Sequence, residues 1–414
     1  MDWELQPVTE PGRRFVETAE GHAADFAKRA AEHDADGTFP HENFDELKAS
    51  GFLTAPVPGE FGGWGLTSVN DYAAGVNRLA RGDGSTAIAA AMHLSFCLMG
   101  ARTWRLQEAL GDDQAAVSGG FLSLLGAGAV AMANVTEPGT DIRHPLTEFT
   151  KADGGYRLNG HKIFGTLSEV ADLFFVPGRI TNDDGSVSRV GAIVTRGTPG
   201  QQIKSNWDAL GMRGSGSHDI VYEDCFVEEA LMLPGGAPLG EDDMFSLTIA
   251  TAAQLPLVAA MFGIAERAYE LVVNMARTRK KAPSNRPLAD RAAIQQQVAE
   301  MEVDMVTARA LLAWGGRFLD EVFVDMPVTD VDTELLHDVN RELQCVKLTV
   351  NRKAIEIVDR ALTISGGAGY MSGNELSRLY RDVRAGPFMQ PLSPVDVYEY
   401  VGKIALGLDP AVES

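Results

Sequence analysis

The spacing of hydrophobic positions divides the 414-residue chain into three parts. From about residue 11 to residue 120, apolar and polar residues alternate with the period of amphipathic helices. From about 126 to 235 they alternate residue by residue over short runs, which is typical of half-buried strands. From Met244 the helical period returns and continues almost to the end. This order predicts helical, β and helical domains in succession and not alternating βαβ units.

Individual elements follow from these runs and from the glycines and prolines between them. The predicted helices are 15–33, 43–50, 69–81, 85–110, 244–279, 288–324, 333–362 and 397–408, and the predicted strands are 131–136, 155–158, 173–179, 190–195 and 220–227. We therefore expect an α+β fold with an N-terminal α-helical domain (1–125), a central antiparallel β domain (126–240) and a C-terminal helical domain (241–414).

Charge, cysteine content and the apolar runs disfavour several classes of binding partner. The formal net charge of −21 disfavours non-specific binding to nucleic acid or anionic lipid, because both are polyanions. Cys97, Cys225 and Cys345 lie far apart and make no metal-ligand spacing, so we predict no metal site and a reducing compartment. Charged and polar residues interrupt the longest apolar run, 247–273, which favours a core helix over a membrane span. With no secretory signal evident at Met1, the prediction is a cytoplasmic protein without a membrane or nucleic-acid partner.

Six short motifs carry the candidate chemistry. In chain order they are Glu60-Phe61-Gly62-Gly63, Thr136-Glu137-Pro138, Asn159-Gly160-His161-Lys162-Ile163-Phe164-Gly165-Thr166, Gly211-Met212-Arg213, Gly366-Gly367-Ala368-Gly369-Tyr370 and Arg378-Leu379-Tyr380-Arg381-Asp382. Together they resemble the acyl-CoA dehydrogenase superfamily of flavoproteins over essentially the whole chain. The resemblance implies a C-terminal four-helix bundle and FAD held between the β domain and that bundle. It also implies a homotetramer or homodimer in which the cofactor crosses a subunit interface.

The resemblance implies three contacts to the flavin ring. A flavin needs a few directed hydrogen bonds to its ring and a flat apolar wall beside it. Thr136 and Thr166 are expected at the ring edge, and Phe164 is expected to form the wall. Without the motif context, these residues are as well explained as strand threonines and a core phenylalanine.

Further contacts are implied along the rest of the cofactor. Arg279 falls where the family places an arginine on the FAD pyrophosphate, a group that a guanidinium fork suits well. Gly366 and Gly367 let a second subunit's cofactor approach the backbone closely. A solvated arginine and a helix C-terminal turn are the alternatives. Ala282 replaces the family's phenylalanine, which weakens the Arg279 contact, and Thr363 replaces a glutamine on the adenosine side. FAD is the expected cofactor, and FMN is the alternative if the protein is a monooxygenase.

The pattern fails at the catalytic base. Dehydrogenation removes an α-proton, so a carboxylate must lie within reach of it. Most of the family places a Glu eight residues after the Arg-Asp pair, and that position is Gln390 here. An alternative position on the first bundle helix is Ala253, with Gln254 beside it. The thioester loop is also shortened, which leaves Thr140 as the only substitute for a substrate-binding serine, and Arg213 is a weaker candidate substrate contact.

Three hypotheses about function remain open, and the overall similarity of the motifs favours the first. The first is an acyl-thioester dehydrogenase that passes electrons to an electron-transfer flavoprotein and takes its base from Asp396, Glu399 or Glu266. The second is a flavin monooxygenase of the same superfamily, which uses reduced flavin from a reductase, activates O2 and needs a dry pocket instead of a strong base. There His93 is a candidate to protonate or orient an intermediate, although a lone histidine on an apolar helix is more often a core residue. The third is a flavin- or acyl-binding subunit without turnover.

Overall fold

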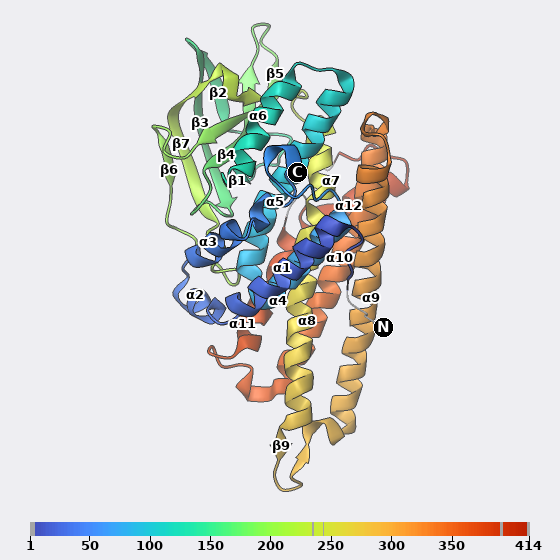
Figure 1. Ribbon diagram of the computed structural model, residues 1–414. Coiled ribbons are helices and arrows are strands. Elements are labelled where there is room, and N and C mark those ends of the chain that lie inside the picture. Colours follow the sequence, from blue (N-terminus) through green and yellow to red (C-terminus); the bar gives the residue numbers. More distant parts are fainter. Residues whose placement is uncertain (1–4, 234–235, 243, 390–391, 412–414) are drawn as a thin grey trace.

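A sheet lies on one side of the molecule, and three long helices, α8 (Gln254–Thr278), α9 (Ala292–Asp320) and α10 (Thr333–Ser365), stand beside one another on the other (Figure 1). This arrangement comes from a computed structural model that describes residues 5–233, 236–242, 244–389 and 392–411. The α+β class predicted from the hydrophobic pattern is confirmed.

The N-terminal region is helical up to Gly126. Its helices are α1 (Glu10–Phe26), α2 (Ala30–Asp36), α3 (His41–Ala49), α4 (Val69–Gly82), α5 (Gly84–Leu110) and α6 (Gln114–Gly126). The single helix predicted over 15–33 is in fact two. Arg29, in the break between them, turns towards α3, where its guanidinium donates to Asn43 Oδ1 and to Glu46 Oε1 at 2.7 Å. This tertiary contact explains why the local pattern did not show the break.

The N-terminus of helix α4 is capped by Ser68, whose hydroxyl accepts from Asp71 N at 3.0 Å, and it is also bonded to the other helical region. The carboxylate of Asp320, at the end of α9, accepts from Val69 N at 2.6 Å and from the Ser68 hydroxyl at 2.5 Å. Such a bond satisfies amide groups that a helix N-terminus leaves without intrahelical partners. Burial raises the pKa of Asp320 to about 6. The start of α4 is therefore fixed directly to the C-terminal bundle.

The central region is one mixed sheet. Its strands are β1 (Ala131–Ala133), β2 (Glu148–Ala152), β3 (Gly155–Gly165), β4 (Leu173–Thr181), β5 (Val187–Thr195), β6 (Gln201–Ile203), β7 (His218–Glu228) and β8 (Met232–Leu233), in the order β6-β7-β3-β2-β4-β5-β8 with β1 beside β4. Most neighbours are antiparallel, as predicted, but β1 and β2 both run parallel to β4. The reason is that β2 and β3 form a hairpin, after which the chain crosses β2 and enters β4 in the direction of β2.

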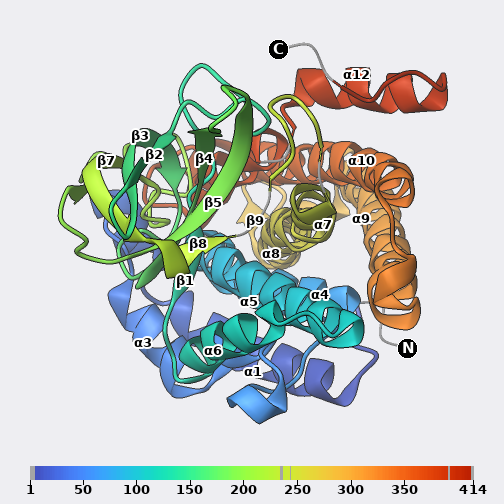
Figure 2. The same cartoon turned by 90° about the horizontal axis from the view of Figure 1, so that it is seen from above.

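The C-terminal region is helical from Met244. Besides α8 to α10 it contains α7 (Met244–Ala252), α11 (Glu375–Asp382) and α12 (Pro394–Ala405). A small hairpin, β9 (Lys280–Lys281) and β10 (Arg286–Pro287), joins α8 to α9. A π-helical turn, Glu321–Asp325, extends α9 and completes the run predicted over 288–324. Figure 2 shows α12 along the outer side of α10, where the Tyr400 hydroxyl lies 3.0 Å from His337 Nδ1.

Two helical stretches, Gly84–Leu110 and Ser246–Thr278, are long and apolar enough to cross a membrane by length and composition. In the folded chain, 83% and 78% of their most apolar windows are buried against other elements. Small residues in α5, including Ala87 and Ala89–Ala91, are fully enclosed, which allows neighbouring helices to approach closely. The packing of both stretches is that of core helices.

Candidate active site

Two of the flavin motifs are joined by a buried ion pair. Lys162 on β3 donates to Glu137 Oε1 at 2.5 Å and to the Pro177 carbonyl at 2.6 Å. The second carboxylate oxygen of Glu137 accepts from the backbone amides of Leu146 and Thr147 at 2.7 and 3.1 Å. Lys162 is fully buried, and this burial lowers its pKa while the Glu137 carboxylate opposes the shift. The pair fixes the Thr136-Glu137-Pro138 turn against the strand that leads to Phe164 and Thr166.

The residues expected at the flavin ring lie together at one end of β3. The Thr136 carbonyl accepts from Ile163 N at 2.9 Å, which places it beside Phe164. The Thr166 hydroxyl lies 2.8 Å from the Ser217 hydroxyl. Phe164 is 59% exposed although it is a large apolar side chain. Hydroxyl groups and an open aromatic face therefore occur side by side, as a flavin ring requires.

Trp207 belongs to the same corner, and the sequence did not single it out. Its ring centre lies 6.1 Å from that of Phe164 in an edge-to-face arrangement, and its Nε1–H donates to the Met212 carbonyl at 3.0 Å. A tryptophan four residues before the Gly-Met-Arg motif was the available signal. The indole widens the apolar wall that Phe164 begins.

Backbone strain is concentrated in this corner. Phe164, Leu167 and Met212 all have positive φ angles, of 53°, 77° and 53°. Bulky L-residues seldom adopt this conformation, because the Cβ atom meets backbone atoms there. Strained residues persist where surrounding contacts determine them and often mark functional sites. Their position independently supports a ligand site at this end of the sheet.

The predicted cofactor-tail residues also lie close to one another. Arg279 follows α8, and its Nη1 donates to the Ser365 carbonyl at 3.1 Å. Ser365 precedes Gly366 and Gly367, and a Cβ built on either glycine meets no atom within 4 Å. The structure thus brings Arg279 to an open glycine turn although 86 positions separate Arg279 from Ser365. A guanidinium beside accessible backbone amides fits a phosphate group.

The Gly-Met-Arg segment packs on the Arg-x-x-Arg-Asp helix. Asp382, which is buried, accepts from Met212 N at 2.7 Å, and burial raises the pKa of its carboxyl to about 6. A Cβ on Gly211 would lie 2.3 Å from the Arg381 carbonyl oxygen, so only glycine fits there. Arg213 donates to the Asp34 carbonyl at 2.8 Å and to Asp208 Oδ1 at 2.9 Å. These bonds attach the Gly-Met-Arg segment to α2, which favours a structural role for Arg213. Its proposed substrate contact stays a prediction.

His93 is a core residue of α5. Its Nδ1 accepts from Ala131 N at 3.0 Å, and its Nε2 lies 3.1 Å from the Leu53 carbonyl, which fits the tautomer protonated at Nε2. Burial lowers its pKa to about 4. The imidazole also borders a polar cavity of about 360 Å³ with Lys48 and Trp64. This geometry favours the structural alternative given in the sequence analysis over a catalytic role.

Two of the three candidate replacement bases, Glu266 and Glu399, have other partners. Glu266 is buried, and its carboxylate accepts from Arg81 Nη2 at 2.7 Å and from Asn77 Nδ2 at 2.9 Å. Glu399 pairs with Lys403 at 2.6 Å on α12, and Asp396 lies in the first turn of the same outer helix. Glu266 and Glu399 are therefore engaged in ion pairs and are not free bases.

Gln390 itself lies outside the described residues. The second family position, Ala253, is a methyl group at the start of α8, and the neighbouring Gln254 donates to Asn340 Oδ1 at 2.8 Å. The Thr140 hydroxyl donates to the His144 carbonyl at 2.5 Å, so its own loop uses the group predicted to contact a substrate. That contact also stays a prediction.

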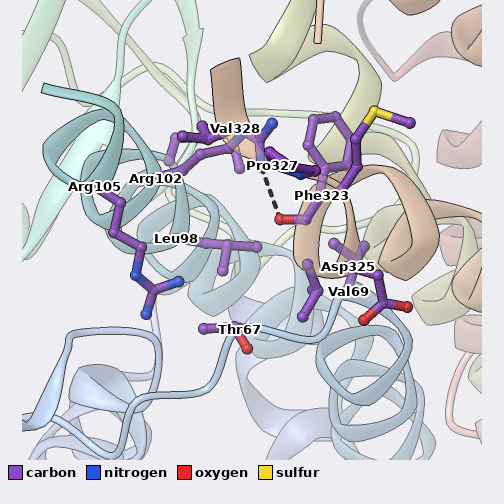
Figure 3. A pocket seen from close by; sticks show the side chains of 12 residues that line it. Thr67, Val69, Leu98, Arg102, Arg105, Phe323, Asp325, Pro327 and Val328 are labelled. Carbon is purple, nitrogen blue, oxygen red and sulfur yellow. Dashed lines mark hydrogen bonds between the residues drawn. The ribbon is translucent and has the colours of Figure 1, made fainter. Parts of the chain in front are cut away.

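A separate cavity of about 330 Å³ opens between α4, α5 and the end of α9 (Figure 3). Its walls are mostly apolar, with Arg102 and Arg105 on α5 and Asp325 on the π-helical turn. Arg102 Nη1 donates to the Phe323 carbonyl at 2.7 Å, and burial together with Arg105 lowers the pKa of Arg102 to about 10. None of the predicted flavin contacts lines this cavity, so it is distinct from the motif corner.

Comparisons with known proteins agree with the assembled motifs. Models of the acyl-CoA dehydrogenase N-terminal, middle and C-terminal domains match residues 9–103, 129–225 and 255–390. L-evernosamine nitrososynthase from a Micromonospora species is 34% identical over 97% of this chain and 92% of its own length. The amino sugar nitrososynthase DnmZ from Streptomyces peucetius is 31% identical over 97% and 95%.

Solved structures give the same result. KijD3 in complex with FMN and dTDP-3-amino-2,3,6-trideoxy-4-keto-3-methyl-D-glucose superposes with a TM-score of 0.89, at 34% identity, covering 99% of this chain and 97% of that one. Butyryl-CoA dehydrogenase from Megasphaera elsdenii shares the fold, with a TM-score of 0.83 at 24% identity over 98% and 100%. With its motifs assembled at one end of the sheet and on the facing bundle, this chain belongs to the acyl-CoA dehydrogenase family of flavin oxidoreductases.

Proposed function

We propose that the protein is a flavin-dependent N-oxygenase that acts on the amino group of a nucleotide-linked amino sugar. The observation that carries the proposal is the loss of a carboxylate at both family base positions, Gln390 and Ala253. The carboxylate of Glu266, 13 positions after Ala253, is held by Arg81 and Asn77. Abstraction of an α-proton needs such a base, whereas oxygenation of an amine uses the lone pair of the nitrogen.

The relatives support this choice. Two proteins at least 31% identical over nearly the whole chain are named as nitrososynthases, and one acts by name on an amino sugar. KijD3, at 34% identity, is described with FMN and a dTDP-linked 3-amino sugar. Each oxygenation of an amine consumes one O2 and two electrons. A bound reduced flavin would supply the two electrons. In this chain, Phe164 and Trp207 would form the apolar wall, and Thr136 and Thr166 the hydrogen-bonding edge.

For the cofactor we propose FMN, delivered reduced by a separate flavin reductase in the cytoplasm. The adenosine side of an FAD site is weakened by Thr363, and the arginine contact to a pyrophosphate by Ala282, whereas Arg279 and the Gly366-Gly367 turn remain available for one phosphate. FAD is the alternative that the family resemblance implies. Flavin extracted from purified protein and identified by mass spectrometry distinguishes the two.

A second copy of the chain is proposed to complete the site, as in the homotetramer implied by the family. Tyr370 and Met371 follow the glycine turn and are 84% and 64% exposed. Exposed apolar side chains beside a candidate phosphate site fit a subunit interface. Mass measurement in solution tests the assembly, and a monomeric holoenzyme would contradict it.

The activity test uses holoenzyme, NADH, a flavin reductase, O2 and a dTDP-linked 3-amino sugar. We expect the amino sugar to gain oxygen atoms, and in a reaction under 18O2 the product mass should show that these atoms come from O2. In parallel, anaerobic butyryl-CoA or octanoyl-CoA should leave the flavin absorbance unchanged. Bleaching by either thioester, without oxygenation of the amino sugar, would establish the dehydrogenase alternative instead.

Gln390→Glu tests directly whether the missing carboxylate at position 390 determines the reaction. If position 390 is the base position and the pocket accepts thioesters, this variant gains exchange of the acyl-CoA α-proton with solvent. For a sugar-nucleotide pocket we expect no such gain over wild type. Deuterium incorporation into butyryl-CoA, followed by NMR, measures the difference.

A further inference from the structure

The cavity shown in Figure 3 contains two cations that make no ion pair. Arg102 and Arg105 both line it, and within the described residues neither guanidinium lies within 4.0 Å of a carboxylate oxygen. Arg102 is half-buried and Arg105 keeps part of its surface exposed, so a ligand can reach the pair from solvent. Burial lowers the pKa of both side chains, although Glu60, which does not line the cavity, opposes the shift of Arg105. A cation drawn out of bulk water without a counter-charge is costly.

The two arginines differ in their other contacts. Arg102 Nη1 donates to the Phe323 carbonyl at 2.7 Å, and its guanidinium carbon lies 4.5 Å from the centre of the Phe323 ring. That bond satisfies a carbonyl in the last turn after α9, where intrahelical donors run out. Arg105 lies one turn later on the same face of α5 and has no hydrogen bond or ion pair in the part of the chain that the structure describes. Its guanidinium is therefore available to a group that the chain does not supply.

The rest of the cavity wall is mostly apolar. Leu98 and Met99 on α5, Val69 on α4 and Phe323 on the π-helical turn border it. Its volume of about 330 Å³ is that of a small-molecule pocket, and such pockets combine apolar walls with a few polar groups that orient the ligand. A π-helical turn is rare and often marks a functional site, and this one forms the wall that faces α5. The cavity therefore fits a molecule with an apolar body and an anionic group.

Asp325 restricts the charge of that molecule. Its carboxylate belongs to the wall formed by the π-helical turn. Together with Arg102 and Arg105, the described lining residues carry two positive charges and one negative charge, a net charge of one positive unit. A single negative charge neutralises this set, whereas a phosphate monoester with a charge of about −1.5 to −2 near pH 7 exceeds it. A planar carboxylate also matches the paired N–H groups of a guanidinium.

We propose that this cavity is a second ligand site, which binds a small monocarboxylate with an apolar body. The carboxylate binds to Arg102 and Arg105, and the apolar body packs against Leu98, Val69 and Phe323. A neutral molecule of the same shape leaves both cations without a partner and binds more weakly. The site is separate from the corner around Phe164 and does not depend on the proposed oxygenation.

Calorimetric titration of the flavin-loaded holoenzyme with three probes of equal chain length tests the chemistry of the site. The probes are sodium octanoate, octyl phosphate and 1-octanol, at low ionic strength because salt screens partly exposed charges. Octanoate is expected to bind at least about tenfold more tightly than 1-octanol, since only octanoate makes charge-assisted bonds. Equal affinity for these two, or no binding of octanoate, would overturn the proposal. Tighter binding of octyl phosphate than of octanoate would overturn the assignment of a monocarboxylate.

Variants of Arg105 connect the binding to this cavity. Arg105→Met is expected to weaken octanoate binding by about tenfold or more, and Arg105→Lys by less, because lysine keeps the charge but not the planar fork. Arg105 makes no bond within the described fold, so both variants should fold like wild type. Arg157→Met is the matched control, since Arg157 also lies over a phenylalanine ring, that of Phe226 at 5.3 Å, but on β3. Octanoate affinity should be unchanged in this control, and an unchanged affinity in Arg105→Met would overturn the site.

Photo-crosslinking gives the location independently. An octanoate probe with a diazirine near its methyl end is irradiated with the holoenzyme, and the modified peptides are identified by mass spectrometry. Modification is expected in peptides covering 98–105 or 323–328 and should fall in Arg105→Met. Modification confined to 160–168 or 205–214 would place octanoate at the flavin corner and contradict a second site. None of these measurements needs turnover, so failure of the proposed oxygenation leaves this test intact.

Discussion

Two fully enclosed lysines in this protein have opposite surroundings. Lys162 in the sheet faces the Glu137 carboxylate at 2.5 Å, whereas Lys347 in the bundle faces only the carbonyls of Met389 and Leu392. Burial lowers the pKa of both. The first charge is compensated within the fold, and the second is not. The difference separates an ion pair that fixes a motif from a cation that fixes a backbone segment.

The comparison predicts how the stability of each region responds when its buried lysine is removed. In the sheet, loss of one partner leaves the other charge buried and alone, which is strongly destabilising. In the bundle, removal of Lys347 frees two carbonyls but also relieves the burial of an uncompensated charge. Stability should therefore respond strongly to Lys162, and the local order of one segment should respond to Lys347.

The largest expected effect is that of Lys162→Met. This change leaves the Glu137 carboxylate buried without its cation, and we expect the free energy of unfolding to fall by about 3–5 kcal/mol. Urea denaturation of the holoenzyme at pH 7.5 measures it. A loss below about 1 kcal/mol would mean that the pair is hydrated and would remove the contrast between the two lysines.

A pH effect of similar size should distinguish Lys347. Its pKa is about 8 in the folded protein and 10.5 in the reference state. Between these values the unfolded chain binds more protons, so the contribution of Lys347 makes unfolding free energy rise with pH by on the order of 3 kcal/mol. Burial also lowers the pKa of Lys162 to about 8, so part of the rise should remain without Lys347. Denaturation at pH 7.5 and 10 should therefore show a larger rise in wild type than in Lys347→Met. An identical pH dependence in both proteins would mean that Lys347 is already neutral or is hydrated.

An intermediate effect is expected when both members of the sheet pair are made apolar. Lys162→Met combined with Glu137→Leu removes both charges and leaves the amides of Leu146 and Thr147 without their acceptor. We expect a net loss of about 1–3 kcal/mol, smaller than that of the single lysine variant. A double variant less stable than Lys162→Met would show that the amide bonds, and not the charge pair, dominate. Urea denaturation at pH 7.5 again provides the value.

The smallest effect should come from Lys353→Met. Lys353 and its partner Glu356 are partly exposed, whereas its other partner, Asp304, is buried but keeps a second cation, because Arg360 Nη1 reaches Asp304 Oδ2 at 3.0 Å. Partly exposed ion pairs contribute little, so we expect a change of at most about 1 kcal/mol in the same denaturation assay. A larger loss would disqualify this variant as a control for Lys347.

Much of the fold could be predicted from the sequence because local patterns and packing agree. Helices α4, α5 and α10 lie where the helical spacing places them, and the motifs identified the family. Strand β2 was not predicted, since Glu148, Thr150 and Lys151 give it little apolar content. The parallel pairing of β2 with β4 depends on a crossover that no local pattern records.

The polar stripe on α10 shows the limit most clearly. Asn340, Gln344, Lys347 and Asn351 share one helix face, and their polarity alone would assign that face to solvent. Tertiary packing instead covers it with α8 and the segment from Gly386. The Glu137–Lys162 pair was hidden in the same way, because its two residues belong to different motifs. Motif residues were visible from the sequence, but the groups that hold the motifs in place were not.

Asp320 has a consequence for how chains of this architecture can be divided or recombined. Val69 N at the start of α4 donates to a residue about 250 positions later, so the N-terminal helical region lacks one acceptor that its own helix uses. A fragment that ends before α9 would keep the bond from Asp71 N to the Ser68 hydroxyl but would lose the acceptor of Val69 N. Exchange of one helical region between relatives would therefore keep a stable helix start only if Ser68 and Asp320 were inherited together.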